Sequence, residues 1–308
     1  MKKRICSIFL LLTLLLALLP LQANAVTAGM AALDMQEISR TEYQISKDVK
    51  EYEWLLNNGS LTKQMVGHVM EVKVGKDSTA TLAAGYSDYN IGDIKNNQWA
   101  MVKTTEQAQA METRRKVNVV GAINGGGFDM SNGRPSGALV LDGTVIQSAN
   151  STTFWVDKEN VAHITDGTEY TQAVADGRVS EAISSFGDIL SDGKAYTGLD
   201  NSTRASRTAV GIKQDGSVVL FMVDGRQSPY SAGMTMAELA AAMEELGCER
   251  AINLDGGGSS TFATQREGDV VSEVDPNGKS AGLTLRCRPS DGYERRVSNT
   301  LMVLSSAK

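Results

Sequence analysis

Residues 251–261 read Ala251-Ile252-Asn253-Leu254-Asp255-Gly256-Gly257-Gly258-Ser259-Ser260-Thr261. The mainly apolar half up to Leu254 is typical of a buried strand, and it leads directly into a carboxylate, three glycines and three hydroxyl side chains. A strand end holds Asp255 in place, the glycines let backbone N–H groups approach an anion without a Cβ atom in the way, and the hydroxyls add donors. This stretch predicts an active site at a strand end, acting on a negatively charged group.

A helix precedes this strand. Thr235-Met236-Ala237-Glu238 has the form of a capping box, and Gly247 provides the stop after Leu246. The predicted helix lies between the apolar strand 218–223 and the strand 250–254. This order favours a right-handed crossover in a mixed sheet.

A second unit of the same form occurs earlier in the chain. A helix is predicted from a capping box at residues 104–107 to Arg115 or Lys116, followed by the strand 117–123 and then by Asn124 and three glycines. We hypothesise that the two strand ends face one cleft, with Asn124 and Asp255 across it. Chance is the alternative, because 30 of the 308 residues are glycine.

The remaining pattern is one of short strands. Strands are predicted over residues 66–74 and 79–86, and Asp142-Gly143 and Asp215-Gly216 are typical of hairpin turns. The sequence therefore predicts an α+β fold: a mixed β-sheet core with a few packed helices and glycine-rich strand-end loops forming a cleft. We expect one domain over residues 66–308, preceded by a polar extension, residues 26–65, that is helical or loosely docked up to about residue 60.

The first 25 residues have the features of a secretory signal peptide. Three basic residues precede a short apolar stretch, and Ala23-Asn24-Ala25 resembles a cleavage site. An uncleaved membrane anchor is the alternative, but the apolar stretch is short for a spanning helix. We therefore expect a secreted, extracellular or cell-surface protein without stable membrane insertion after cleavage.

Charge and cysteine content limit the partners and the compartment. Removing residues 1–25 removes three of the 30 Lys and Arg residues and none of the 36 Asp and Glu residues, so the formal net charge changes from −6 to −9. Such an acidic protein is not expected to bind nucleic acid. Cys248 and Cys287 remain, and the sequence leaves open whether they form a disulfide or stay as core thiols.

Several familiar catalytic motifs are missing. The sequence contains no H-E-x-x-H, C-x-x-C or G-x-G-x-x-G, and Glu273 stands where a phosphate-binding loop ending in Lys279-Ser280 requires glycine. The two histidines, His68 and His163, are expected to be ordinary half-buried residues. We therefore expect no metal and no cofactor. A charged cluster, residues 294–296, is expected at a solvated strand edge, with contact to the cleft as the alternative.

Six motifs occur in a fixed order along the chain. They are Asn124-Gly125-Gly126-Gly127-Phe128, Arg207-Thr208-Ala209-Val210-Gly211, Asp224-Gly225-Arg226-Gln227, Ser231-Ala232-Gly233-Met234-Thr235, residues 253–261, and Arg296-Val297-Ser298-Asn299. Together they resemble the phosphodiester glycosidase family over roughly residues 66–304. One departure concerns Gly127: members often have N-G-x-F-F, so this chain lacks one aromatic residue of the expected sugar-stacking wall.

The resemblance implies hydrolysis of a sugar–phosphate diester, of the N-acetylglucosamine type or a related glycan, at the sugar C1–O bond. Most glycosidases need a general acid, but a phosphate monoester, with a second pKa of about 6, leaves without much help. One carboxylate then suffices, and Asp255 is expected to activate water or to stabilise the oxocarbenium-like centre.

Arg207 is the best candidate for a guanidinium that binds the phosphate, and Arg226 is the second candidate. Further phosphate or substrate contacts are expected from Gly125, Gly126, Gly256, Gly257, Gly258, Ser259 and Ser260. Contacts to sugar hydroxyls or to the attacking water are expected from Asn124, Asp224 and Asn299.

Each of these roles has a plainer alternative. Asp224-Gly225 is also a common turn, Arg207 is also compatible with a surface ion pair, and Asn299 with pairing at a sheet edge. Two other functions stay open: a non-catalytic module that binds cell-wall or polysaccharide phosphates, and a metal-assisted phosphodiesterase that cleaves P–O. We predict that EDTA leaves the activity intact. A cell-surface glycopolymer is one reasonable substrate, and no residue selects a particular one.

Overall fold

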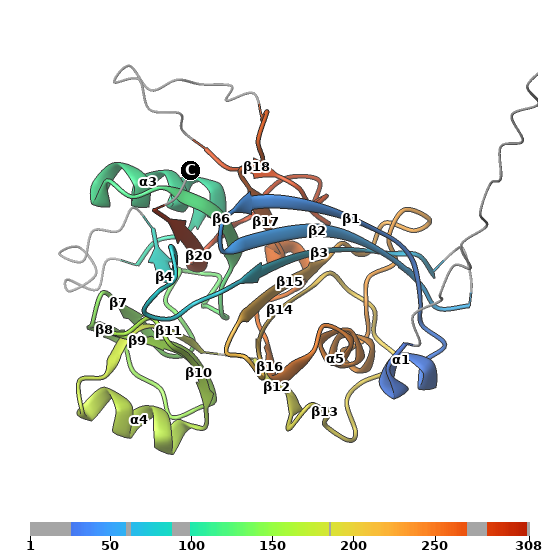
Figure 1. The fold of residues 1–308 in the computed structure, drawn as a ribbon, viewed down its shortest axis with the longest axis horizontal. Helices are drawn as coiled ribbons and strands as arrows, with labels where there is room; N and C mark the ends of the chain where they lie inside the picture. Colours follow the sequence, from blue (N-terminus) through green and yellow to red (C-terminus); the bar gives the residue numbers. More distant parts are fainter. Residues whose placement is uncertain (1–25, 60–62, 88–98, 185, 270–281, 307–308) are drawn as a thin grey trace, which may run out of the picture.

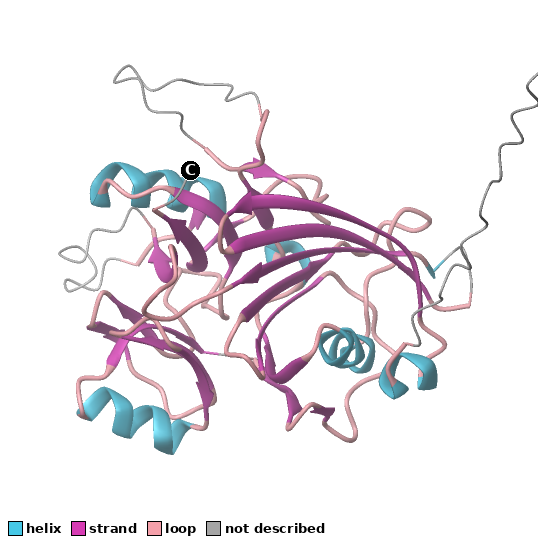
Figure 2. Cartoon of the chain, in the orientation of Figure 1, coloured by secondary structure: helices cyan, strands magenta, loops and turns pink. Residues whose placement is uncertain are grey.

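The computed structural model describes residues 26–59, 63–87, 99–184, 186–269 and 282–306. The helices of these segments are α1 (Ala28–Ala32), α3 (Thr104–Arg115), α4 (Gly167–Ala175), α5 (Met236–Glu245) and the 3₁₀ helix η2 (Gly257–Ser259). The strands are β1 (Gln36–Ser46), β2 (Val49–Asn57), β3 (Met65–Val72), β4 (Ala80–Tyr86), β5 (Val102–Lys103), β6 (Val119–Asn124), β7 (Leu139–Leu141), β8 (Thr144–Gln147), β9 (Thr153–Asp157), β10 (Ala162–Thr165), β11 (Val179–Ser184), β12 (Gly187–Ser191), β13 (Lys194–Ala195), β14 (Arg207–Lys213), β15 (Val218–Val223), β16 (Cys248–Asn253), β17 (Phe262–Thr264), β18 (Thr284–Leu285), β19 (Arg296–Val297) and β20 (Asn299–Ser305). Figure 2 shows strands through the middle of the molecule, with α1, α3 and α4 at its periphery and α5 within the arc of the large sheet.

The strands of the described segments form three main sheets. The largest has eight strands in the order β1-β2-β3-β15-β14-β16-β12-β13. The two five-stranded sheets have the orders β10-β9-β11-β7-β8 and β18-β17-β6-β20-β4, and β19 pairs with β5 in a two-stranded sheet. The last strand, β20, lies between β6 and β4, so the C-terminal part of the chain completes a sheet begun by its first half.

The eight-stranded sheet is apolar on both faces, and this explains the unbroken apolar run of β15. Val218, Leu220 and Met222 point into a cluster shared with the two five-stranded sheets. The alternate residues of β15, Val219 and Phe221, pack with α5 on the opposite face. A strand that is buried on both faces needs apolar residues at every position. The molecule is therefore layered, with α5 on one side of the large sheet and the smaller sheets on the other (Figure 1).

The N-terminal segment differs from the prediction. The expectation of a helical or loosely docked lead-in is wrong, because β1 and β2 form the edge of the eight-stranded sheet and pair in sequence with β3. Most side chains of β1 are exposed, so the strand has a polar sequence without an apolar period. On β2, Trp54 is fully buried and belongs to the core cluster around α5. Figure 1 shows β1, β2 and β3 curving together over α5.

The helix α5 agrees with its predicted limits. Thr235 is the N-cap and forms the capping box with Glu238, and the chain leaves the helix at Gly247 with φ +78°. The helix links β15 to β16, which run in the same direction with β14 between them. The α+β class is confirmed. The hydrogen-bonded neighbours in the described sheets run antiparallel, so same-direction strands occur here only as second neighbours.

The helix α3 has the predicted limits, but its N-terminus is capped differently from the prediction. The predicted capping box is wrong: the N-cap is Lys103, which provides no side-chain hydrogen bond. The carboxylate of Glu294 instead accepts from the backbone N–H of Thr105 at 2.9 Å and from its hydroxyl at 2.7 Å. A residue distant in sequence therefore caps the helix and partly removes the cluster 294–296 from solvent.

Both predicted hairpins are present. Asp142 and Gly143 join β7 to β8 with φ of 51° and 71°, values that suit a two-residue turn of the mirror-image type. Asp215-Gly216 lies in the turn between β14 and β15, with φ +84° at Gly216.

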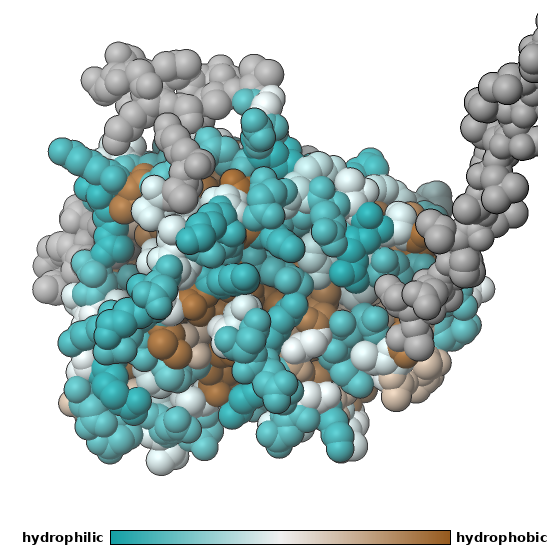
Figure 3. Space-filling model, in the orientation of Figure 1, coloured by the Kyte–Doolittle hydropathy of each residue, from teal (hydrophilic) through white to brown (hydrophobic). Residues whose placement is uncertain are grey.

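The predicted signal peptide, residues 1–25, lies outside the described residues. No helix within the described segments has the length and apolar character needed to cross a membrane. Cys248 and Cys287 are both buried free thiols, so the structure contains no disulfide between them. The face drawn in Figure 3 is mostly hydrophilic, with apolar groups scattered between polar ones.

Candidate active site

The two glycine-rich loops lie against each other, although β6 and β16 belong to different sheets. The backbone N–H of Asp255 donates to the carbonyl oxygen of Gly125 at 3.1 Å. The side-chain amide of Asn124 donates to the carbonyl oxygen of Asp255 at 2.7 Å. The expected proximity of the two strand ends is thus confirmed.

The side chain of Asp255 is partly exposed at this junction. Its Oδ1 accepts from the N–H of Gly256 at 2.9 Å. Burial raises the pKa of the Asp255 carboxyl above its ordinary value, and the Ser259 hydroxyl, the Gly256 N–H and the Arg295 guanidinium oppose that rise. Asp255 is therefore a carboxylate in a poorly solvated position, which increases its basicity.

Arg295 is a site residue that the sequence assigned to a solvated strand edge. Its guanidinium binds the carboxylate of Asp291 through Nε at 2.9 Å and through the NH2 nitrogen at 2.7 Å. The NH1 nitrogen donates to the hydroxyl of Ser259 at 3.4 Å. A Cβ atom on Gly258 would lie 2.1 Å from the same guanidinium, so glycine at this position permits the approach of Arg295.

Two other arginines flank the glycines that follow Asp255. A Cβ atom at Gly257 would lie 3.2 Å from a terminal guanidinium nitrogen of Arg226, and one at Gly256 would lie 3.9 Å from Cδ of Arg207. Neither guanidinium forms an ion pair with a carboxylate of the described residues. Two neighbouring cations without a paired carboxylate create a positive potential around the glycines that follow Asp255.

The two arginines are held differently. Arg207 is half-buried, and it donates from Nε to the carbonyl of Met234 at 3.1 Å and from NH2 to that of Thr203 at 2.8 Å. Burial lowers the pKa of Arg207, and the Arg226 guanidinium acts in the same direction while Asp200 opposes it. Arg226 is exposed and has φ +60°, an unusual backbone conformation for a residue with a side chain. The pair thus combines one fixed guanidinium with one accessible guanidinium.

Asn124 does not have the position expected of a substrate contact. It is fully buried, and its Oδ1 accepts from the hydroxyl of Thr208 at 2.8 Å and from the N–H of Thr261 at 3.0 Å. Its amide nitrogen is engaged with Asp255, as described above. The expected contact with sugar or water is therefore wrong for this geometry, because protein groups occupy both ends of the side chain.

Asp224 is also fully buried. Its Oδ2 lies 3.1 Å from Nε2 of His68 and accepts from the hydroxyl of Tyr230 at 2.8 Å, while its Oδ1 accepts from the N–H of Arg288 at 2.8 Å. This network contradicts the expected contact of Asp224 with substrate. His68, expected to be half-buried, is 2 % exposed and stacks on Phe262.

Asn299 holds the first glycine loop by hydrogen bonds to two of its N–H groups. Its backbone carbonyl accepts from the N–H of Gly125 at 2.8 Å, and its side-chain oxygen accepts from the N–H of Gly126 at 2.8 Å. Asn299 is 3 % exposed, so it does not have the solvent access expected of a sugar contact. Gly125 and Gly126 accordingly do not offer free N–H groups to a phosphate.

The second loop is engaged in a similar way. The N–H of Gly257 donates to the carbonyl of Ser206 at 2.8 Å, and that of Gly256 donates to its neighbour's carboxylate. Ser260 is 1 % exposed and accepts from Thr208 at 3.2 Å, and Ser259 is fully buried beneath Arg295. Gly258 is also buried. The glycine N–H groups and serine hydroxyls expected to bind phosphate are thus mostly used inside the protein, and the two arginines remain as candidate anion ligands.

Metal binding has no obvious centre in the described segments. They contain no group of three or more His, Cys, Asp or Glu side chains arranged to hold an ion. The prediction that EDTA leaves activity intact stays a prediction.

Comparison with known proteins identifies the family and several relatives of this chain. A family model described as phosphodiester glycosidase matches residues 117–304. Mouse N-acetylglucosamine-1-phosphodiester alpha-N-acetylglucosaminidase is 28% identical over 165 residues, which cover 46% of this chain and 31% of the mouse protein. A Bacillus subtilis (strain 168) protein, the SPbeta prophage-derived uncharacterized protein YomE, is 29% identical over 213 residues, covering 65% and 30% of the two chains. The chain spans about a third of the length of these curated relatives.

A solved structure has the same fold. The catalytic domain of the zebrafish N-acetylglucosamine-1-phosphodiester alpha-N-acetylglucosaminidase, auto-inhibited by its pro-peptide, superposes with a TM-score of 0.58 at 20% identity. The match covers 86% of this chain and 88% of the zebrafish chain. At this identity the likeness concerns the fold.

Proposed function

Because the chain belongs to the phosphodiester glycosidase family, we propose that it hydrolyses the sugar C1–O bond of a sugar 1-phosphodiester and releases free sugar and a phosphomonoester. The observation that carries this proposal is one partly exposed carboxylate, Asp255, followed by two glycines that adjoin arginines: a Cβ atom at Gly256 would lie near Cδ of Arg207, and one at Gly257 near the guanidinium of Arg226. This arrangement suits a substrate whose reacting carbon is bonded to a phosphate oxygen.

The arginine pair binds the phosphate in this proposal. Arg207 is anchored by two backbone carbonyls, and its NH1 nitrogen has no hydrogen-bond partner among the described residues. The guanidinium of Arg226 lies close to Gly257. A planar guanidinium can hold two phosphate oxygens, and both cations stabilise the negative charge that develops on the departing phosphomonoester. A proton donor for the leaving group is then unnecessary.

Asp255 acts on the sugar side. Its carboxylate either takes a proton from the attacking water or stabilises the positive charge that develops at C1. Partial burial strengthens both effects, because fewer water molecules compete for the carboxylate. Asn124 holds the loop through the carbonyl oxygen of Asp255, and Arg295 holds the Ser259 hydroxyl. We therefore assign positioning roles to both residues.

Asp224 positions the second arginine. Its buried hydrogen bonds fix the residues that begin the turn to Arg226, two positions later in the chain. We further propose that the sugar is of the N-acetylglucosamine type, that a cell-surface glycopolymer is its source, and that the protein is secreted through the segment 1–25.

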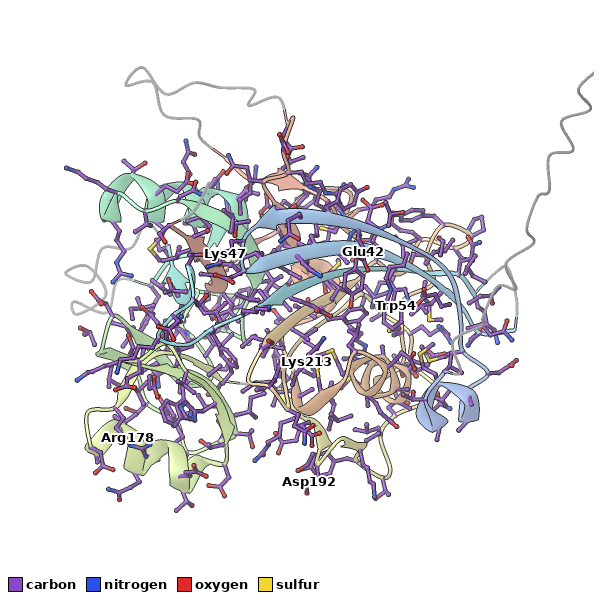
Figure 4. All side chains as sticks on the ribbon, in the orientation of Figure 1. Glu42, Lys47, Trp54, Arg178, Asp192 and Lys213 are labelled. Atoms are coloured by element: carbon purple, nitrogen blue, oxygen red, sulfur yellow. The ribbon has the colours of Figure 1, made fainter. Side chains whose placement is uncertain are left out.

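The test is incubation of the purified protein with an N-acetylglucosamine 1-phosphodiester, with free sugar and sugar 1-phosphate quantified separately. We expect free sugar, and we expect Asp255→Asn to lower kcat/KM by about 10²- to 10⁴-fold, the usual effect of losing a positioned acid or base. Asp192→Asn is the matched control, because Asp192 is an exposed turn residue at the end of β12 (Figure 4) and its φ of 50° suits asparagine. Sugar 1-phosphate as the product would instead mean P–O cleavage.

Arg226→Lys separates hydrolysis from simple anion binding in the same assay. Lysine keeps the charge but not the planar fork, so we expect kcat/KM to fall about tenfold or more for the loss of a charge-assisted hydrogen bond. Phosphate binding without any product, in the presence or absence of EDTA, would favour the binding-module alternative.

A further inference from the structure

Phe186 is an exposed aromatic residue beside the candidate active site. It is 58 % exposed, whereas Phe128, Phe154, Phe221 and Phe262 are at most 9 % exposed. Exposure of more than half of a phenylalanine to water is unfavourable, because apolar surface is normally removed from water on folding. A ring left in this position is therefore available for an apolar partner.

The ring of Phe186 lies over Gly127, in the first glycine loop. A Cβ atom at Gly127 would lie 2.1, 2.5 and 2.9 Å from three carbons of the ring. Gly127 does not have a positive φ, so its backbone conformation is open to other residues. The reason for glycine at this position is therefore the close approach of the Phe186 ring, which occupies the volume of a residue 127 side chain.

The backbone of Phe186 is tied to the strand that carries the candidate catalytic carboxylate. Its N–H donates to the carbonyl of Asn253 at 2.9 Å, two residues before Asp255. The preceding residue on the described part of β11, Ser184, has its carbonyl oxygen packed against Gly126. Phe186 therefore contacts the first glycine loop through its ring and strand β16, which carries the second loop, through its backbone.

On these observations, and resting on the proposed function, we propose that Phe186 is a specificity-determining residue whose ring is the platform for the sugar of the substrate. The C–H groups on one face of a pyranose carry slight positive charge, and they are attracted to the negative face of an aromatic ring. Arg207 and Arg226 bind the phosphate, and Phe186 contacts the sugar face from the first glycine loop. Recognition of sugar and recognition of phosphate then depend on different residues.

The test is direct binding of free sugars, followed by ligand-observed NMR, so that no turnover is needed. The probes are N-acetylglucosamine, glucose and galactose, and inorganic phosphate serves as the separate probe of the arginine pair. We expect Phe186→Ala to weaken the binding of the preferred sugar about three- to tenfold and to leave phosphate binding unchanged. Phe186→Trp should retain sugar binding. Tyr196→Ala, which removes another exposed aromatic ring, is the control and should change neither affinity.

A double-mutant cycle tests the contact between ring and loop. Gly127→Ala places a methyl group where the ring lies, so it should weaken sugar binding in the parent protein and have no further effect in Phe186→Ala. The proposal is overturned if none of the three sugars binds, or if their affinity is the same in the parent and in Phe186→Ala. Sugar binding that depends on Phe186, in a protein without hydrolytic activity, would overturn the proposed function and leave this inference standing. Hydrolysis by the parent protein, together with unchanged sugar affinity in Phe186→Ala, would overturn this inference and leave the proposed function standing.

Discussion

The candidate site depends on single residues that are in direct contact although they lie far apart in the sequence. Asn124 and Asp255 are 131 residues apart and share a hydrogen bond of 2.7 Å. The sequence identified Asp255 by its position at a strand end, but it could not distinguish this partly exposed carboxylate from the buried carboxylate of Asp224. The two carboxylates differ in burial: Asp255 is partly exposed and available for chemistry, whereas Asp224 is buried and holds the surrounding backbone.

At the residue scale, we predict that Asp255→Asn stabilises the fold at neutral pH although it lowers activity. The pKa of this carboxyl is raised in the folded state by burial, so its favourable contribution is present below the unfolded-state value of about 3.9 and is lost as the pH rises through the folded-state value. Asparagine keeps the oxygen that accepts from Gly256 and carries no charge to desolvate. Thermal unfolding should show a gain for the variant at pH 7 that shrinks toward pH 4. A variant that is less stable than its parent at pH 7 would contradict this explanation.

Buried polar contacts join elements that are distant in the sequence. Glu181 on β11 is 5 % exposed and accepts from the N–H of Ala84 on β4 at 3.1 Å and from that of Asp142, in the β7–β8 turn, at 3.2 Å. This one side chain therefore links two sheets. Such links are invisible in local patterning, as is the capping of α3 by Glu294.

At the element scale, we predict a pH-dependent stability that arises from Glu181. Burial raises the pKa of Glu181 to about 8. Because the folded-state value lies above the unfolded one, the stabilising contribution of this group is complete below about pH 4 and is lost as the pH rises through 8. Glu181→Gln should therefore gain melting temperature relative to the parent between pH 6 and pH 9. Glu159→Gln, at an exposed ion pair with Lys76, is the control and should show no such trend. A constant difference across this range would exclude the linkage.

The whole molecule is built on the eight-stranded sheet, which is covered on both faces. Its edge is formed by β1 and β2, which the sequence had assigned to an extension. Trp54 from β2 meets Phe221 from β15 edge to face at a centroid distance of 6.3 Å, in the cluster that also contains α5. The N-terminal strands therefore share the core that supports β15 and β16.

At the scale of the molecule, we predict that Trp54→Ala costs about 3–5 kcal/mol in the free energy of unfolding, the usual cost of removing a large buried aromatic side chain. Glu42→Ala, on the exposed part of β1, is the matched control and should change it by less than about 0.5 kcal/mol. Both residues are labelled in Figure 4. Equal effects of the two substitutions in chemical denaturation would mean that β1 and β2 are docked on an independently stable domain.

The sequence by itself determined local features of this protein: the strands that follow the two predicted helices, the two Asp-Gly hairpins, the capping box of α5, and the carboxylate at the end of β16. These depend on side-chain periodicity and on turn and cap chemistry, which act within a few residues. Only the tertiary structure decided which polar groups face solvent. Hydrogen bonds across the sheets use the N–H groups of Gly125, Gly126 and Gly257, bury Asn124, Asp224 and Asn299, and bring Arg295 and Phe186 to the site. A polar residue type has the same appearance in sequence whether its partner is water, substrate or protein, and that partner is fixed by packing between distant segments.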